Sequence, residues 1–142
     1  MSRDRLPPCT LYRLRMATRK ATRAYDRHLA RCGLGSPQYG LLMTIDAIPG
    51  NPVGVVAERL DMDRTTLTRN LKLLVERGFV STEGQDRRTR ALRLTKAGEA
   101  KLAEARTHWR QAQNELEAHN GEQPTLKLNV LLAGLIDKLP DD

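Results

Sequence analysis

The chain has 142 residues, a length that fits one compact domain or one domain with an oligomerisation extension. Its net charge is +7, and only 4% of its residues are aromatic. These values predict a thin aliphatic core, with apolar surface left over for a second copy of the chain. They exclude a membrane-spanning protein, because the longest apolar run, residues 130–136, is far shorter than the ~18 residues that a span requires.

The first residues contain no apolar targeting segment, and two cysteines are too few for a disulfide framework. We therefore expect a cytoplasmic protein with reduced thiols. His108 and His119 share a helix face if the helix is continuous, and Glu115 lies nearby, so a metal site is conceivable. Isolated histidines without cysteine support are usually surface residues, and we expect neither a metal nor a cofactor.

The charge is distributed in blocks along the chain. Residues 1–31 and 64–93 are strongly basic, whereas residues 32–63 and 94–142 are net acidic. Basic blocks of this kind favour a polyanionic partner, of which nucleic acid is the simplest. The alternative is an ordinary solvated basic surface.

Hydrophobic periodicity and capping signals predict six helices and one β-hairpin. The helices are expected at 10–32, 37–48, 53–60, 64–77, 96–119 and 124–139, and the strands at 79–82 and 90–94. The expected N-caps are Ser36, Asn51, Asp63 and Thr95. The fold class is therefore mostly α with a small β-hairpin wing. The long first and last helices carry apolar stripes that one subunit has too little surface to cover.

Residues 53–94 follow the order helix, turn, helix and basic hairpin, which is the order of a winged helix-turn-helix. The helix at 64–77 has one apolar stripe, made of Leu67, Leu71, Leu74 and Val75. Short threonines on its other side would let the helix approach DNA base edges, where Arg69 reaches guanine and Asn70 reaches adenine. Arginines at the hairpin tip would enter a minor groove or bind phosphates. The candidate DNA-binding residues are Arg64, Thr65, Thr66, Thr68, Arg69, Asn70, Lys72, Arg87, Arg88 and Arg90.

Two segments carry a resemblance to a known family. Residues 63–71, with the sequence DRTTLTRNL, resemble the recognition helix of MarR-family transcriptional regulators. The sequence DRR at 86–88, followed by LRLT at 92–95, resembles the wing of that family. The resemblance extends from about Leu11 to Leu139, nearly the whole chain.

The resemblance implies a homodimer whose first, fifth and sixth helices form the interface. Residues 1–35 would be the N-terminal dimerisation helix, residues 36–95 the winged helix-turn-helix domain and residues 96–142 the C-terminal dimerisation helices. Two winged domains would then bind a near-palindromic duplex. By the same analogy, Arg88 matches the wing arginine, and Asp86 would stabilise the wing through an ion pair.

Relatives in this family bind small aromatic or phenolic effectors between the dimerisation region and the winged domain. By that resemblance, Tyr12, Tyr25, Tyr39, Met43 and Trp109 could line such a cleft. Since the chain has few aromatics, Tyr39 and Trp109 could equally be core residues, and the core interpretation is favoured for the other three. Other relatives sense oxidants through a cysteine near the first helix. Cys9 is the candidate here, although a continuous helix would hold it ~34 Å from Cys32, too far for a bridge within one chain.

The sequence therefore predicts a dimeric DNA-binding regulator, with repression as the expected mode and a small-molecule effector as a possible partner. The alternatives are an oxidant sensor acting through Cys9 and a winged-helix module that docks proteins without specific DNA binding. A protein-docking face would carry apolar anchors in place of the threonine row and the arginines. We do not expect an enzyme, because no nucleophile–base pair and no glycine-rich phosphate loop is present.

Overall fold

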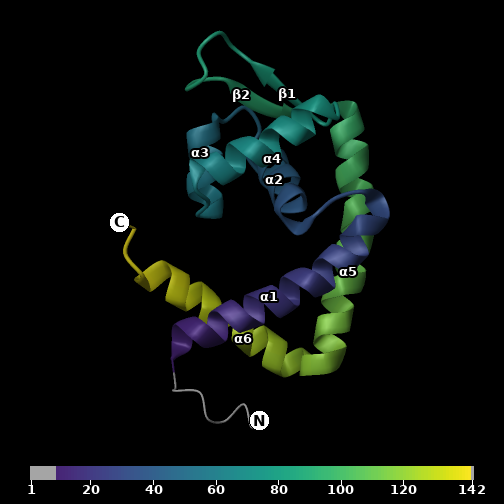
Figure 1. The fold of residues 1–142 in the computed structure, drawn as a ribbon, viewed down its shortest axis with the longest axis vertical. Helices are drawn as coiled ribbons and strands as arrows, with labels where there is room; N and C mark the ends of the chain where they lie inside the picture. Colours follow the sequence, from purple (N-terminus) through teal and green to yellow (C-terminus); the bar gives the residue numbers. More distant parts are fainter. Residues whose placement is uncertain (1–8, 142) are drawn as a thin grey trace.

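The computed structural model describes residues 9–141 and contains the predicted helices and hairpin in the predicted order (Figure 1). The helices are α1 (Thr10–Leu29), the short 3-10 turn η2 (Ala30–Cys32), α2 (Ser36–Ala47), α3 (Val53–Leu60), α4 (Arg64–Glu76), α5 (Lys96–Asn120) and α6 (Glu122–Lys138). The strands are β1 (Val80–Glu83) and β2 (Ala91–Leu94). The chain is therefore mostly α-helical, with one antiparallel hairpin as its wing.

Two of the four expected N-caps are confirmed and two are wrong. The Asp63 side chain accepts a hydrogen bond from the Thr66 backbone, and the Thr95 hydroxyl accepts one from the Gly98 backbone. The N-cap of α2 is Gly35 rather than Ser36, because the Gln38 side chain accepts the hydrogen bond from the Gly35 backbone N–H. The N-cap of α3 is Pro52 rather than Asn51. Helix α2 therefore starts one residue earlier than expected, whereas α3 starts at Val53 as expected and only its N-cap differs.

The hairpin is short and has a third backbone segment beside it. Val80 pairs with Leu94 and Glu83 pairs with Ala91 in an antiparallel register. On the other edge of β2, the Gly50 N–H donates to the Leu92 carbonyl, and the Leu92 N–H donates to the Asn51 carbonyl. The loop between α2 and α3 therefore supports the wing from behind.

One apolar core joins the start of the winged domain to the helices around it. Leu29, Leu42 and Leu67 are fully buried, and they come from α1, α2 and α4. Leu92 of β2 and Leu102 of α5 are buried in the same cluster. The core therefore holds the C-terminal end of α1 and the first turns of α5 against the winged domain.

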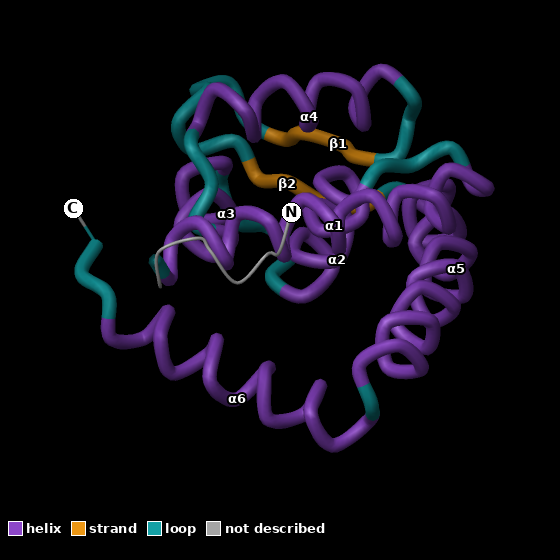
Figure 2. The backbone as a smooth tube through the Cα atoms, turned by 60° about the horizontal axis from the view of Figure 1, so that its bottom comes forward, coloured by secondary structure: helices purple, strands orange, loops and turns teal. Residues whose placement is uncertain are grey.

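The far ends of α1 and α6 have little to cover them. Figure 2 shows α6 extending away from the other helices, attached through α5. Exposed large apolar side chains gather on these two helices: Leu11, Tyr12 and Met16 on α1, and Leu126, Leu128, Val130, Leu131 and Ile136 on α6. The apolar stripes of the first and last helices, which we expected one subunit to cover only in part, are thus exposed in the single chain. Within the described residues, no helix is both long and apolar enough to cross a membrane.

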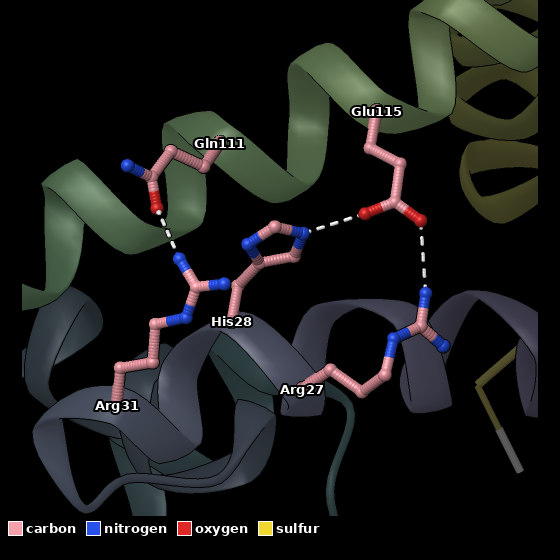
Figure 3. A network of polar contacts seen from close by, with 5 residues as sticks. All are labelled: Arg27, His28, Arg31, Gln111 and Glu115. Carbon is pink, nitrogen blue, oxygen red and sulfur yellow. Dashed lines mark hydrogen bonds and ion pairs between the residues drawn. The ribbon is translucent and has the colours of Figure 1, made fainter.

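A polar network binds the second half of α1 to α5 (Figure 3). Glu115 of α5 accepts from Arg27 at 2.8 Å and from His28 at 2.6 Å. Arg31 donates to Gln111 at 3.4 Å. Tyr25, about one helical turn before His28, donates to Gln113. The charged groups lie along the exposed edge of the helix pair, so the network fixes the register of the two helices.

The network makes stability depend on pH in a defined window. The hydrogen bond from His28 lowers the pKa of the Glu115 carboxyl most; desolvation opposes it, and Arg27 lowers the pKa further. A carboxyl whose pKa is lower in the folded state stabilises the protein at pH values above its unfolded pKa of about 4.3. This stabilisation is lost as the pH falls through the folded-state pKa. We expect Glu115→Gln to be less stable than the parent chain at pH 5, with a smaller difference at pH 3. Urea unfolding at both pH values measures it, and a difference that is unchanged at pH 3 would contradict this assignment.

Candidate nucleic-acid interface

Helix α4 presents a polar face because its apolar stripe is anchored in the core. Leu67 and Leu74 are fully buried and Leu71 is nearly so. At 100° per residue, the opposite side of the helix carries Thr65 and Arg69, followed by Lys72. All three are exposed. Val75, expected in the buried stripe, is 38% exposed, because its position lies at the edge of that stripe and turns toward the wing.

A groove of about 700 Å³ separates α4 from the wing. Its floor is apolar, formed by Val53, Leu71, Val75 and Leu92. Its rim carries cations from both sides: Arg64 and Lys72 from α4, and Arg87, Arg88 and Arg90 from the wing. Thr68 and Thr82 also line it, as does Glu76, whose carboxylate lies 3.9 Å from Lys72 Nζ. Two walls of guanidinium and ammonium groups facing one another can hold a polyanion strand between them.

Sequence reasoning missed part of the lining of this groove. Val53 and Gly54 of α3, Thr82 of β1 and Leu92 of β2 line it and were not among the candidate residues. The Arg64 guanidinium lies so close to Gly54 that a side chain there would begin 3.2 Å from its Nη2 atom. The glycine at position 54, one residue into a helix, was the signal available in the sequence. It lets the Arg64 side chain lie flat over α3.

The other candidates on α4 are partly engaged within the helix. The Thr66 hydroxyl donates to Asp63 at 2.6 Å, and the Asn70 amide donates to the Thr66 carbonyl at 3.0 Å. The hydrogen bonds from the Thr66 hydroxyl and backbone lower the pKa of the Asp63 carboxyl, so it remains an ionised cap. Thr66 and Asn70 are only half exposed. The structure thus separates them from the outward row of Thr65, Arg69 and Lys72.

The wing tip is closed by hydrogen bonds, and among the described residues Asp86 forms no ion pair. The Asp86 carboxylate accepts from the Arg88 backbone N–H at 3.0 Å, which closes a tight turn. The Asp86 carbonyl also accepts from the Thr89 N–H. Arg90 donates its Nε–H to the Gly84 carbonyl, while Arg87 and Arg88 are exposed. An aspartate two residues before a backbone N–H forms such a turn without a cation.

The five candidate effector residues do not converge on one site. Tyr39 is buried and stacks on Trp109, with ring centroids 6.3 Å apart. Burial raises the pKa of the Tyr39 hydroxyl, against the opposing effect of Arg106 and Arg110. Tyr25 is half-buried and bonded to Gln113. Tyr12 and Met43 are exposed, and the groove described above contains none of the five. Only Tyr39 and Trp109 lie together, and they do so as two rings stacked on one another.

The two cysteines lie at opposite ends of α1, and the glutamate considered for a metal site is engaged elsewhere. Cys9 is half-buried just before α1, and Cys32 is buried at the end of η2. The 20 residues of α1 between them span ~30 Å. Burial raises the pKa of the Cys32 thiol, which disfavours the reactive thiolate. Glu115, once considered near His119 as a metal ligand, is instead bonded to His28 and Arg27.

Comparison with known proteins places this geometry in a family. The profile of the MarR family matches residues 33–91, which contain α2, α3, α4 and the wing. The comparison with curated proteins finds no relative.

Among solved structures, the M. tuberculosis transcriptional regulator MosR is 31% identical, with 92% of this chain and 96% of that chain covered and a TM-score of 0.77. The same regulator in complex with DNA is 33% identical, with 92% and 99% covered and a TM-score of 0.73. The transcriptional repressor CouR bound to a 23-mer DNA duplex is 26% identical, with 90% and 92% covered and a TM-score of 0.83. An identity above 30% to MosR over nearly the whole of both chains, together with the family profile on the winged domain, shows that this chain belongs to the MarR family of transcriptional regulators.

Proposed function

We propose that the protein is a sequence-specific, double-stranded DNA-binding transcriptional regulator that acts by binding rather than catalysis. The observation that carries the proposal is the groove between α4 and the wing, whose rim is cationic on both sides. The relatives MosR and CouR have each been solved on DNA. A protein-docking module of the same fold would not need five cations around one groove.

The two sides of the groove have different tasks on a duplex. The row of Thr65, Arg69 and Lys72 is the outermost part of α4, so it enters the major groove when the helix docks. Arg69 is then the candidate for a guanine edge, since its guanidinium can bond two acceptors at once. Arg87 and Arg88, exposed at the wing tip, bind phosphate or a narrow minor groove. The wing therefore adds affinity, and α4 adds sequence preference.

The active form is a homodimer on a near-palindromic site. What supports this is the open apolar surface of α1 and α6, where Leu131 and Ile136 are 71% and 68% exposed. A second copy that covers this surface is related by a two-fold axis, so it presents two recognition helices to two half-sites. We expect half-sites about one helical turn, ~10 base pairs, apart.

The finer proposals concern regulation. We propose repression, in line with CouR, which is described as a repressor and has also been solved with p-coumaroyl-CoA. A small aromatic or phenolic effector would meet Tyr39 and Trp109, the stacked pair between α2 and α5. Oxidation at Cys9 is the second candidate for regulation, because Cys9 is the more accessible thiol. Separate DNA titrations with aromatic acids and with peroxide distinguish the two.

The experiment that tests the main proposal is selection of duplexes from a random library, followed by titration of two variants. Arg69→Ala should lower the free energy of binding to the selected site by ~1–3 kcal/mol per contact and leave binding to random DNA nearly unchanged. Arg88→Ala should weaken both and flatten the dependence of affinity on salt, because fewer counterions are released. The dimer presents each change twice, so the losses exceed those of one contact.

Arg110→Ala is the matched control, because it removes an exposed arginine from α5, away from the groove. It should bind both duplexes like the parent chain. Equal losses on both duplexes for Arg69→Ala would identify Arg69 as a phosphate contact. Unchanged binding by both variants would reject the DNA model and favour the protein-docking module.

A further inference from the structure

The C-terminal end of α1 and η2 is bound by cations from two other elements. Gly33 has φ +75°, which lets the chain turn so that the Leu34 N–H donates back to the Leu29 carbonyl. The carbonyls of Cys32 and Gly33 then remain open. The Cys32 carbonyl accepts from Lys101 Nζ of α5 at 3.1 Å, and the Gly33 carbonyl accepts from Arg77 Nη1 at 2.7 Å. Arg77 is the C-cap of α4.

Phe79 lies against both cations. The Arg77 guanidinium carbon is 4.9 Å from the centre of the Phe79 ring, and Lys101 Nζ is 5.7 Å from it. The backbone on each side fixes the ring in place, because the Phe79 N–H donates to the Leu74 carbonyl and its carbonyl accepts from the Thr95 N–H. Phe79 is the only phenylalanine of the chain. One aromatic ring therefore joins the end of α4, the start of α5 and the end of α1.

We propose that Arg77, Phe79 and Lys101 act as a positioning clamp that sets the angle between α1 and the recognition helix α4, and thereby the half-site spacing that the dimer accepts. The proposal rests on the DNA-binding dimer proposed above. None of the three residues lines the groove, so their effect on DNA is through the orientation of α4.

The physical reason is the directionality of these contacts. The apolar core between α1, α2 and α4 resists separation, but packing of aliphatic side chains such as Leu29 and Leu74 tolerates small rotations. Hydrogen bonds from a cation to a carbonyl depend on angle and are stronger than neutral ones. They also meet the negative end of a helix dipole, and the cation–aromatic contacts add to them. A small change of angle at Arg77 is magnified at the far end of α4.

The DNA test uses the duplex selected with the parent chain, with its central spacer lengthened or shortened by one or two base pairs. Because each base pair rotates and shifts one half-site, the parent chain should lose ~10-fold in affinity per changed base pair. Arg77→Ala and Phe79→Leu should lose less than ~3-fold per changed base pair, since the two α4 helices can then adjust. Arg77→Lys should recover part of the preference, and Arg110→Ala should keep all of it. A merely structural role would lower the melting temperature without changing the spacing preference.

A second measurement separates failure of the clamp from failure of the DNA proposal. Spin labels at Thr22→Cys on α1 and Glu76→Cys on α4, in a Cys9→Ser chain diluted with unlabelled protein, report the distance between the two helices without DNA. We expect one narrow distance in the otherwise unchanged chain and a broader or shifted distribution with Arg77→Ala. If Arg77→Ala does not fold, Lys101→Met takes its place.

The outcomes are distinct. A parent chain that selects no duplex overturns the DNA proposal, and the spin-label distances still decide the clamp. An unchanged distance distribution together with an unchanged spacing preference overturns the clamp. Equal losses at every spacing, with a flatter salt dependence, would make Arg77 a phosphate contact and also overturn it.

Discussion

Gly98→Ala should destabilise the protein by about 3 kcal/mol or more, at or beyond the upper end of overpacking costs. Gly98 lies in the first turn of α5, where its N–H donates to the hydroxyl of the N-cap Thr95 at 3.0 Å. A methyl group at Gly98 would lie 2.0 Å from the Phe79 carbonyl oxygen. That oxygen belongs to the backbone and already accepts from the Thr95 N–H, so it cannot move without breaking the junction between α5 and the hairpin.

Thermal unfolding followed by circular dichroism measures this, at one protein concentration because a dimer would shift with dilution. We expect the midpoint to fall by about 10 °C or more. Gly40→Ala is the matched control, because Gly40 lies within α2 and has no atom within 4 Å of the added carbon. It should leave stability unchanged or raise it by up to about 1 kcal/mol. A Gly98→Ala midpoint equal to that of the parent chain would contradict the close approach.

Leu74→Ala should cost about 2–5 kcal/mol, the range for truncating a buried leucine. Leu74 is fully buried in the core beneath α4, whereas its neighbour Leu73 is 42% exposed. The same substitution at Leu73 should change stability by less than about 0.5 kcal/mol. Urea unfolding of both variants measures the difference. Equal losses would show that α4 packs through a different face from the one described. The row of Thr65, Arg69 and Lys72 would then not point outward.

Most of the fold was accessible from sequence because the helical pattern is strong and the caps are local. The Asp63 cap and the hairpin were predicted from neighbouring residues alone. The N-caps of α2 and α3 were misplaced by one residue, since Gly35 and Pro52 make no capping hydrogen bond through side chains of their own. Capping rules based on Ser, Asn and Asp do not detect such starts.

The site was predictable in its chemistry but not in its shape. Periodicity identified Arg69 and Lys72 as outward residues, because one helix turn places them there whatever the tertiary structure. The lining of the groove combines α3, α4 and both strands, and contacts between distant segments are invisible to a local pattern. The clamp at Phe79 has the same origin, since Gly33 and Arg77 are 44 residues apart and meet only after folding.

The loop beside β2 has a consequence for how the protein avoids self-association through its strands. An unpaired strand edge is a template for pairing with another chain, and a two-stranded hairpin has two such edges. Here Gly50 and Asn51 occupy the outer edge of β2 at Leu92, so that edge is closed to a passing strand. The remaining edge belongs to β1, which is only four residues long and carries the charge of Glu83. Pairing between copies of this chain through the edges of the hairpin is therefore disfavoured on both sides.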